Sequence, residues 1–411
     1  MSTEQAFITS SGSFLPGPPI CNEEIESVLG MVNGKSSRLK QKILRANGIK
    51  TRHYALNHNQ QSTYQNSELA AQAALHCLNN AFADSSDIDL LAVGSTQGDL
   101  PLPGLASMVQ AELDIPACEI ISTHGVCSSG VMALKAAANQ VKLGEKQHAL
   151  VCASELSSRL LKKSRYEAAK HESCDLEAEF LRWMLSDGAG AFLVEPQPRP
   201  RGISLRIDWI ELISYASDFD LCMSCGTADQ SHWAAGHYSQ AGAATPSIDK
   251  LNELQLSASR SGVTTMVRER SWQDYETYAD AERAGALLLR QNLRILDNIV
   301  KVGVEGFLRL IKQGKITPEE IDYFVCHYSS HTFRGKIVDL LTRSGCMVPE
   351  EKWFTNLYTK GNTGCASIFI ALDELYHSGQ LKEGQTLFCT IPESGRFTTA
   401  YMKLTVVGGK Q

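Results

Sequence analysis

Residues 127–153 read CSSGVMALKAAANQVKLGEKQHALVCA, and residues 365–391 read CASIFIALDELYHSGQLKEGQTLFCTI. Aligned without a gap at an offset of 238, the two segments share Cys, Ser, Ala-Leu, Leu, Glu and Gln at matching positions. Each pattern predicts a turn, a helix, a glycine-containing loop and a strand. Similarity at a fixed offset indicates that one structural unit occurs twice in the chain.

A second pair of segments supports the duplication. Residues 87–93, DIDLLAV, resemble residues 320–326, EIDYFVC, and precede the first pair in the same order. Strands that alternate with helices imply an α/β fold with largely parallel sheets covered on both faces. We therefore expect two duplicated halves, residues 1–197 and 198–411, arranged around a pseudo-twofold axis and joined near the proline-rich residues 196–200.

The composition excludes several classes of protein. The net charge of −6 and the isoelectric point near 6.0 argue against nucleic acid as the main partner. No apolar run is long enough for a membrane span, and the N-terminus lacks the pattern of a signal peptide. Twelve cysteines without such a signal favour free thiols and a cytoplasmic location. The isolated pair Cys222-x-x-Cys225 does not predict a metal site.

Cys127 is the candidate nucleophile. It lies between the strand-like residues 120–123 and a helical pattern that begins after Ser128, with Gly125 in the turn. A thiol beside a helix N-terminus is expected to favour the thiolate, because of the helix dipole and the free N–H groups. The alternative is that Cys127 is a small buried hydrophobic residue, as most cysteines are.

His327 and Asn362 are the proposed partners of Cys127. His327 follows a buried strand pattern, where α/β folds place their chemistry, and Asn362 lies in a turn before the second repeated helix. Each residue alone has an ordinary structural explanation. Because the duplication brings these places to the centre of the molecule, Cys127 can be acylated by a thioester. Neutral His327 and the Asn362 amide can then donate hydrogen bonds to an enolate oxygen.

Three motifs carry a resemblance to a known family. They are GNTGCASIFIALDE at residues 361–374, SDGAGA at residues 186–191 and NGIKTRH at residues 47–53. On these, the chain resembles the thiolase superfamily, specifically its ketoacyl synthase III-like branch. The resemblance implies a thiolase fold with five αβαβα layers, a homodimer, and Cys-His-Asn catalysis on thioesters of acyl carrier protein or coenzyme A without a cofactor. It also implies an oxyanion hole formed by the N–H groups of Cys127 and Gly395.

The same resemblance assigns two arginines to substrate binding. Arg159 falls where a nucleotide-contacting arginine is expected, and Arg52 belongs to a segment near the acyl-carrier entrance. The chain departs from the branch at residues 327–330, HYSS in place of HQAN, and at residues 394–397, SGRF in place of GGGF. Insertions follow Arg159 and Ser214, so simple initiation of fatty-acid synthesis is not expected. The insertion Ser214–Arg270 is either a pocket wall or lid, or a surface elaboration or dimer contact.

Residues 14–19, FLPGPP, and 43–49, ILRANGI, resemble the ketosynthase/cyclases of bacterial dialkylresorcinol and stilbene formation. These enzymes condense a β-ketoacyl and an α,β-unsaturated acyl thioester and close a cyclohexanedione or resorcinol-type ring. Glu155 follows the strand at residues 149–153. In an apolar cleft its carboxyl would have a raised pKa and could move protons. Alternatively, Glu155 is structural, capping a helix or pairing with Arg159.

Three other functions are kept as alternatives. A ketoacyl synthase III-like acyltransferase could perform a decarboxylative Claisen condensation without closing a ring. A non-catalytic partner subunit of a ketosynthase heterodimer would be expected to lose at least one of Cys127, His327 and Asn362, which are all present. A degradative thiolase needs a second cysteine in the C-terminal loop, and residues 392–396, PESGR, contain none.

Overall fold

A mixed sheet of ten strands forms the centre of the chain. The computed structural model describes residues 5–169, 176–228 and 271–408. The strand order is β12-β11-β13-β14-β8-β1-β7-β6-β4-β5. The strands of the first half are β1 (Phe7–Phe14), β4 (Leu90–Ser95), β5 (Glu119–His124), β6 (Ala149–Glu155) and β7 (Gly188–Glu195). Those of the second half are β8 (Ile203–Ile213), β11 (Tyr323–Cys326), β12 (Trp353–Phe354), β13 (Thr386–Pro392) and β14 (Thr399–Gly408).

Each half contributes five adjacent strands in the same arrangement. Numbered along its own half, each set runs third, second, fourth, fifth, first from the outer edge to the middle of the sheet. The two sets meet where β1 pairs with β8 at Phe7 with Arg206 and Ile8 with Leu205. This repeated order agrees with the duplication seen in the sequence. The boundary at residues 197 and 198, which lies in the link between β7 and β8, stays a prediction.

The expectation of largely parallel strands was wrong. In the ten-stranded sheet, the parallel pairs are β4 with β5 and β6, and β11 with β12 and β13. The pairs β6–β7, β7–β1, β1–β8, β8–β14 and β14–β13 are antiparallel. Parallel neighbours need a crossover, whereas β13 and β14 are joined by the short turn 393–398 and must run in opposite directions.

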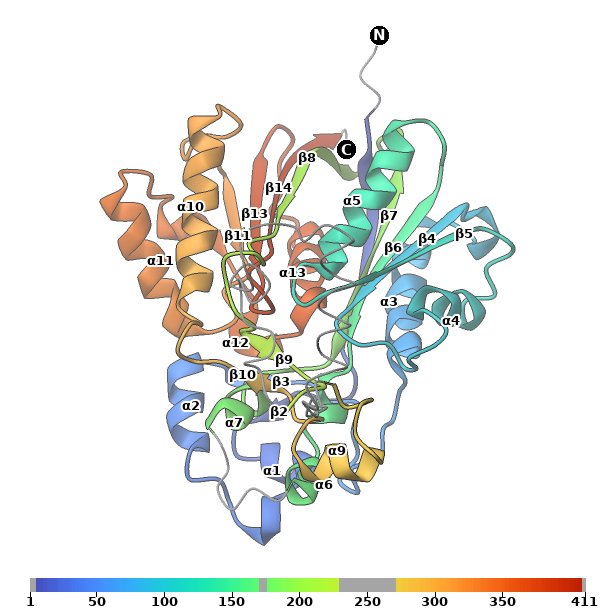
Figure 1. The fold of residues 1–411 in the computed structure, drawn as a ribbon. Coiled ribbons are helices and arrows are strands. Elements are labelled where there is room, and N and C mark those ends of the chain that lie inside the picture. The colour runs from blue at the N-terminus through green and yellow to red at the C-terminus, as the bar shows by residue number, and fades with distance from the viewer. Residues whose placement is uncertain (1–4, 170–175, 229–270, 409–411) are drawn as a thin grey trace, which may run out of the picture.

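The five strands that each half contributes form one half-sheet. Helices cover the two half-sheets and fill the space between them (Figure 1). Helices α5 (Ser129–Lys142) and α13 (Ser367–Tyr376) lie between the half-sheets. Helices α3 (Asn66–Ala81) and α4 (Leu105–Glu112) cover the outer face of the first half, and α10 (Asn298–Lys312) and α11 (His331–Arg343) cover that of the second. The layers are therefore helix, sheet, helix, sheet, helix, as expected.

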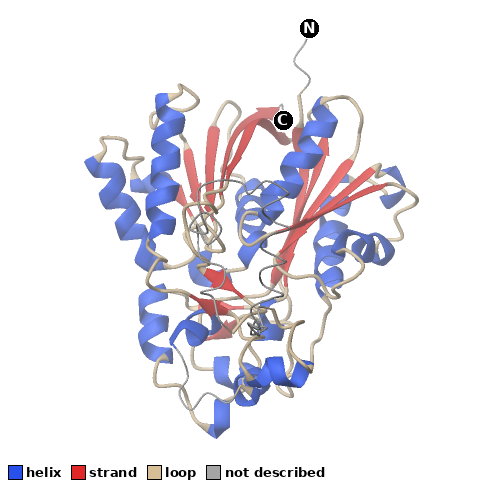
Figure 2. Ribbon diagram, in the orientation of Figure 1, coloured by secondary structure: helices blue, strands red, loops and turns tan. Residues whose placement is uncertain are grey.

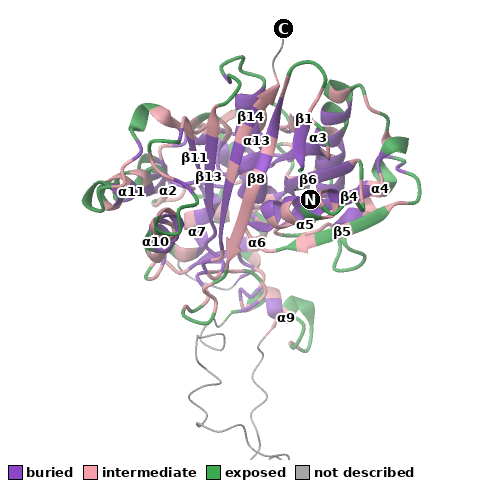
Figure 3. Cartoon of the chain, turned by 90° about the horizontal axis from the view of Figure 1, so that it is seen from above, coloured by how far each residue is buried: buried purple, intermediate pink, exposed green. Residues whose placement is uncertain are grey.

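The buried side chains follow these layers. One apolar core combines α5, α13 and the inner faces of both half-sheets, so it contains residues of both halves. A second core lies under α3 and α4, and a third lies under α10 and α11. Seen from above, most strands and α13 are largely buried, β8 is mostly of intermediate exposure, and the edge strand β5 is mostly exposed (Figure 3). Since the halves share the central core, neither is an independent globule.

Short elements form a cap at the end of the sheet where the repeated helices begin (Figure 2). Long connections of both halves supply them. They are β2 (Ile20–Cys21), α1 (Ile25–Leu29), α2 (Lys40–Asn47), β3 (Thr51–Arg52), α6 (Lys163–Ala168), α7 (Leu176–Arg182), β9 (Met223–Ser224), α9 (Tyr278–Arg283), β10 (Arg290–Gln291) and α12 (Leu357–Lys360). Within the described residues, every helix is too short or too polar to span a bilayer.

Gly130, in the first turn of α5, allows the two central layers to approach. A Cβ built on Gly130 would lie 2.7 Å from the Cβ of Ala153 and 3.0 Å from the carbonyl oxygen of Cys365. One neighbour is a strand of the same half, and the other belongs to the opposite half. The position therefore has no room for a methyl group without a backbone shift.

We expect Gly130→Ala to lower the free energy of unfolding by about 1–3 kcal/mol, the usual cost of overpacking a core. Gly335→Ala is the matched control, because Gly335 lies on α11 with open space around it. That change should leave stability equal or slightly raised, since alanine favours helix. Thermal unfolding followed by circular dichroism measures both. Equal midpoints in Gly130→Ala and the parent protein would contradict the close approach.

Candidate active site

Cys127 lies on the turn between β5 and α5, two residues before the helix begins. Its side chain is buried, with 6% of the residue exposed. Ser128, the residue before the helix, makes no side-chain cap to α5. The N–H groups of Val126 and Ser128 instead donate to the carboxylate of Glu393 at distances of 3.1 and 3.4 Å. A residue of the second half thus holds the turn that carries Cys127.

A cavity with an empty volume of about 670 Å³ opens beside Cys127. Its wall is mostly apolar and comes from both halves and from the cap. Of the predicted site residues, Cys127, Glu155 and Asn362 line it together. The other lining residues are Thr96, Gln97, Val126, Leu156, Ser157, Leu160, Phe180, Leu181, Met184, Leu185, Met223, Leu289, Gln291, Leu296, Ser329, Phe333, Gly364 and Ser394.

The expectation of a favoured thiolate at Cys127 was wrong. Burial raises the pKa of the Cys127 thiol well above its usual range, and the negative charges of Glu393 and Glu155 raise it further. The N–H groups of Cys127 itself and of Ser394 lower it, but by less. Desolvation penalises an anion more than the start of one helix favours it. Cys127 is therefore a neutral thiol at neutral pH, and it would have to lose its proton to act as a nucleophile.

Glu155 ends β6 inside the protein, with 4% of the residue exposed. Its Oε1 accepts from the N–H of Thr96 at 3.1 Å, from the hydroxyl of Thr96 at 2.5 Å and from the N–H of Cys365 at 3.2 Å. Burial raises the pKa of the Glu155 carboxyl, and these donors partly offset the effect. Both features expected of Glu155 are present: it binds the start of a helical segment and it lines the cavity.

Asn362 is held in a fixed orientation between the halves. Its backbone N–H donates to Met184 at 3.2 Å, and its carbonyl accepts from Ser186 at 2.8 Å. The side-chain Oδ1 accepts from the N–H of Gly364 at 3.0 Å. Because Oδ1 is occupied, Nδ2 is the end of the amide that can donate to a ligand in the cavity.

His327 follows β11, as expected, but lines a neighbouring cavity. The two cavities share Ser329 and Phe333 in their walls. Within the described residues, His327 Nε2 is buried without a hydrogen-bond partner. Burial lowers the pKa of His327 to about 4, so the ring is neutral at pH 7. A neutral imidazole with an unused Nε2 can donate to a substrate oxygen or accept a proton.

The loop after β13 differs from the expectation at Gly395. Ser394 lines the cavity and its N–H favours the Cys127 thiolate, whereas Gly395 is not among the lining residues. The carbonyl of Gly395 accepts from the N–H groups of Cys222 and Met223 at 2.9 and 3.3 Å. In this structure Ser394 is therefore the loop residue that offers an N–H to the site.

The two arginines assigned to substrate binding lie outside the cavity wall. Arg159 pairs with Asp99 at 2.7 Å and donates to Gln65. Arg52 is fully buried and donates to Asn22 at 2.9 Å, so it has no surface to offer a carrier protein. The expectation for Arg52 is therefore corrected: its guanidinium belongs to the interior of the cap.

Sequence reasoning missed the roles of Ser394 and Glu393. The signal was present for Glu393, because the offset of 238 pairs it with Glu155. Of the insertion Ser214–Arg270, Met223 lines the cavity. The insertion's aromatic and histidine side chains that could belong to a pocket wall or lid, His232, Trp233, His237 and Tyr238, lie outside the described residues.

Comparisons with known proteins agree with this geometry. The 3-oxoacyl-[acyl-carrier-protein] synthase III family model matches residues 122–210, and the model of its C-terminal part matches residues 311–392. The chain belongs to the thiolase superfamily, in its ketoacyl synthase III-like branch. It is therefore a condensing enzyme, an acyltransferase that forms carbon–carbon bonds.

Curated relatives of this branch match over nearly their whole length. The β-ketoacyl-[acyl-carrier-protein] synthase III of Streptococcus uberis is 24% identical over 90% of both chains. The synthase III of Rhodopirellula baltica is 26% identical over 93% of both chains.

Solved structures show the same thiolase fold. A tetronic acid condensing enzyme superimposes with a TM-score of 0.70 at 18% identity, covering 97% of this chain and 99% of that one. OleA of Xanthomonas campestris, solved with lauric acid and lauroyl-CoA, gives a TM-score of 0.68 at 18% identity, covering 98% and 99%.

The lowered pKa of His327 makes a prediction for this ketosynthase. Because the folded pKa of about 4 lies below the ordinary value of 6.5, His327 stabilises the fold fully above pH 6.5, and this contribution is lost as the pH falls towards 4. Between pH 7 and pH 5 the loss is about 2 kcal/mol. The asparagine of His327→Asn cannot titrate. Between pH 7 and pH 5, the free energy of unfolding of this variant should therefore fall by about 2 kcal/mol less than that of the parent.

Urea unfolding at the two pH values measures this difference. His331→Asn, which removes an exposed histidine of α11, is the control for loss of a histidine. Equal pH dependence in the parent and in His327→Asn would show that His327 is not held neutral by burial.

Proposed function

We propose that the protein condenses two acyl thioesters through an acyl-enzyme at Cys127. The observation that carries the proposal is the joint placement of Cys127, Asn362 and Glu155 in one largely apolar cavity. An apolar cavity suits an acyl chain, and the few polar groups in it suit the thioester end. The lauric acid and lauroyl-CoA bound to OleA, a protein of the same fold, support thioesters as the substrate class.

The proposed first step loads Cys127. The thiol gives its proton to a neighbouring base, and its sulfur attacks the thioester carbonyl. The carrier thiol leaves with a proton, and an acyl-cysteine remains. In this proposal the N–H groups of Cys127 and Ser394, which both favour the anionic form of the Cys127 sulfur, also stabilise the negative oxygen of the tetrahedral intermediate.

The proposed second step forms the carbon–carbon bond. The second thioester loses its α-proton, or carbon dioxide where it carries a β-carboxylate, and becomes an enolate. His327 and Asn362 donate hydrogen bonds to the enolate oxygen. The α-carbon then attacks the acyl-cysteine carbonyl, and the Cys127 thiolate leaves and is reprotonated.

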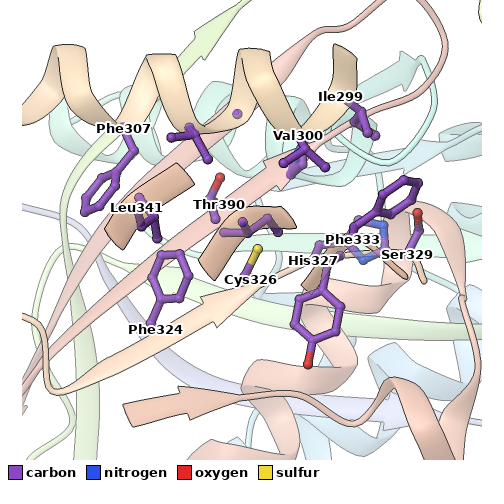
Figure 4. Close-up of a pocket in the computed structure, with 15 residues that line it drawn as sticks. Ile299, Val300, Phe307, Phe324, Cys326, His327, Ser329, Phe333, Leu341 and Thr390 are labelled. Atoms are coloured by element: carbon purple, nitrogen blue, oxygen red, sulfur yellow. The ribbon is translucent and has the colours of Figure 1, made fainter. Parts of the chain in front are cut away.

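The cavity beside His327 supports the use of two acyl groups (Figure 4). Its empty volume is about 450 Å³, and it runs under α10 between the ring of His327 at one end and Phe307 and Phe324 at the other. It adjoins the Cys127 cavity at Ser329 and Phe333. Two apolar cavities that meet beside the proposed catalytic residues offer separate places for two chains.

We further propose that the substrates are a β-ketoacyl and an α,β-unsaturated acyl thioester, and that a cyclohexanedione or resorcinol-type ring closes in this site. The support is Glu155, a buried carboxyl of raised pKa in the cavity wall. Such a group can carry a proton between the steps of ring closure. Condensation without cyclisation, as in ketoacyl synthase III, is the second candidate, because the three bonds to Oε1 also suit a structural Glu155.

The proposal includes delivery and assembly. Acyl carrier protein or coenzyme A would bring the thioesters, with Arg159, whose side chain is 21% exposed beside Asp99, as the candidate phosphate contact. A cytoplasmic location is proposed because the twelve cysteines suit a reducing compartment. A homodimer is proposed because β5 is an edge strand with exposed residues, including Ile120 at 40%. Exposed edge strands are normally covered by another chain or blunted.

The acyl-enzyme is tested by intact-protein mass spectrometry after incubation with acyl thioesters. The parent should gain one acyl group, and Cys127→Ala should gain none. Cys365→Ala is the matched control, because Cys365 is the repeat partner of Cys127 and is fully buried. It should acquire the same adduct as the parent. An adduct that persists in Cys127→Ala would reject Cys127 as the nucleophile.

Glu155→Gln separates condensation from ring closure. Glutamine keeps an oxygen for the N–H groups of Thr96 and Cys365 but cannot carry the proton. We expect normal acylation of Cys127 and a loss of ring product of about 10²-fold or more. Product analysis by liquid chromatography and mass spectrometry measures this, with Glu26→Gln, a buried carboxylate of the cap, as the control. Ring formation at the parent rate would make Glu155 structural.

A further inference from the structure

Glu393 is a buried carboxylate that the proposed reaction does not use. It follows β13 in the loop 393–398, and 5% of the residue is exposed. Three donors converge on its Oε2: the N–H of Val126 at 3.1 Å, the N–H of Ser128 at 3.4 Å and the hydroxyl of Ser128 at 2.6 Å. These donors flank Cys127 on both sides in the sequence. Glu393 therefore binds the turn that carries the proposed nucleophile.

The same arrangement occurs a second time with the halves exchanged. Glu155 is the repeat partner of Glu393, and Cys365 is the repeat partner of Cys127. Glu155 accepts the N–H of Cys365, at the start of the second repeated helical segment. Each carboxylate thus leaves the end of a strand in one half and binds the helix start of the other. The two carboxylates differ in their surroundings. Glu155 lines the cavity, whereas Glu393 binds the residues on either side of Cys127.

Glu393 also adds charge beside the nucleophile. After burial, its negative charge is the largest influence that raises the pKa of the Cys127 thiol, followed by that of Glu155. Cys365 is the other titratable group that interacts with Cys127 from the opposite helix start. His327 lines the adjoining cavity. The N–H groups of Cys127 and Ser394 act in the opposite direction.

We propose that Glu393 is the positioning residue of Cys127, which fixes the turn at residues 126–128 from the second half and sets a negative charge beside the sulfur. Resting on the proposed nucleophilic role of Cys127, this inference assigns two separable effects to one side chain. The three hydrogen bonds hold the sulfur in place for attack. The charge keeps the free thiol unreactive towards small electrophiles.

Two substitutions separate these effects. In Glu393→Gln, the amide oxygen can take the place of Oε2 and keep all three donors, while the charge is lost. In Glu393→Leu, a side chain of similar size loses both the charge and the acceptor. Glu26→Gln is the matched control, because Glu26 is also a buried carboxylate that holds a loop through Ser36 and Ser37 but does not line the cavity.

The first measurement is the pH dependence of Cys127 alkylation by iodoacetamide, read at the Cys127 peptide by mass spectrometry because the chain has twelve cysteines. Removing a negative charge stabilises the thiolate, so the midpoint in Glu393→Gln should move to lower pH by about one unit. Glu26→Gln should keep the parent midpoint. An unchanged midpoint in Glu393→Gln would overturn the charge effect.

The second measurement is the rate of Cys127 acylation by an acyl-coenzyme A thioester. Glu393→Gln should stay within about threefold of the parent, and Glu393→Leu should be at least tenfold slower, because the turn loses its acceptor. Acylation of Glu393→Leu at the parent rate, with a normal circular dichroism spectrum, would overturn the positioning effect. If Glu393→Leu does not fold, Ser128→Ala removes one of the three donors and keeps the charge. It should slow acylation severalfold without moving the alkylation midpoint, and parent-like acylation would again overturn the proposal.

These readouts also separate the inference from the proposed function. Alkylation needs no substrate, so a shifted midpoint in an enzyme that condenses no thioester would leave the inference standing and reject the function. Condensation by the parent with identical behaviour of all Glu393 variants would reject the inference alone.

Discussion

Two buried carboxylates cross between the halves of the chain, and each holds the start of a helix in the other half. Glu393 accepts the N–H groups of Val126 and Ser128, and Glu155 accepts that of Cys365. Neither α5 nor α13 has a side-chain cap of its own. Because an unpaired buried donor costs about 1–3 kcal/mol, both helix starts need the opposite half in place. The central layer, the Cys127 turn and the cavity all depend on these hydrogen bonds between the halves.

The same two carboxylates, together with burial, determine the charge states in the site. Cys127 lies among buried groups with two carboxylates nearby, so its thiol stays neutral, and His327 stays neutral for lack of solvent. A site of this kind stores no preformed thiolate. Its fixed donors, the N–H groups of Cys127 and Ser394 and the amide of Asn362, suit oxygens that become negative during a reaction. The geometry therefore favours chemistry that moves charge from sulfur to oxygen and back.

Much of the fold and part of the site could be predicted from the sequence. The repeated segments predicted two α/β halves, and the family resemblance predicted the five layers. The turn pattern placed Cys127 and Asn362 correctly before their helices. Strand direction was mispredicted, because it depends on whether a short turn or a crossover joins two strands. The neutral state of Cys127 and the burial of Arg52 were missed, since both depend on side chains from distant parts of the chain. Glu393 shared the repeat offset with Glu155, yet its contact exists only once the halves have docked.

The long sequence separation of the Glu393 contact has a consequence during synthesis. Val126 and Glu393 are 267 residues apart, so the turn at Cys127 leaves the ribosome long before its acceptor. At about 5–20 residues per second, translation takes roughly a quarter of a minute to a minute to cover that stretch. Throughout this time the first half exposes the apolar face of α5 and open N–H groups at its start. The contact that completes the Cys127 turn can therefore form only after Glu393 has been synthesised and the second half has docked onto the first.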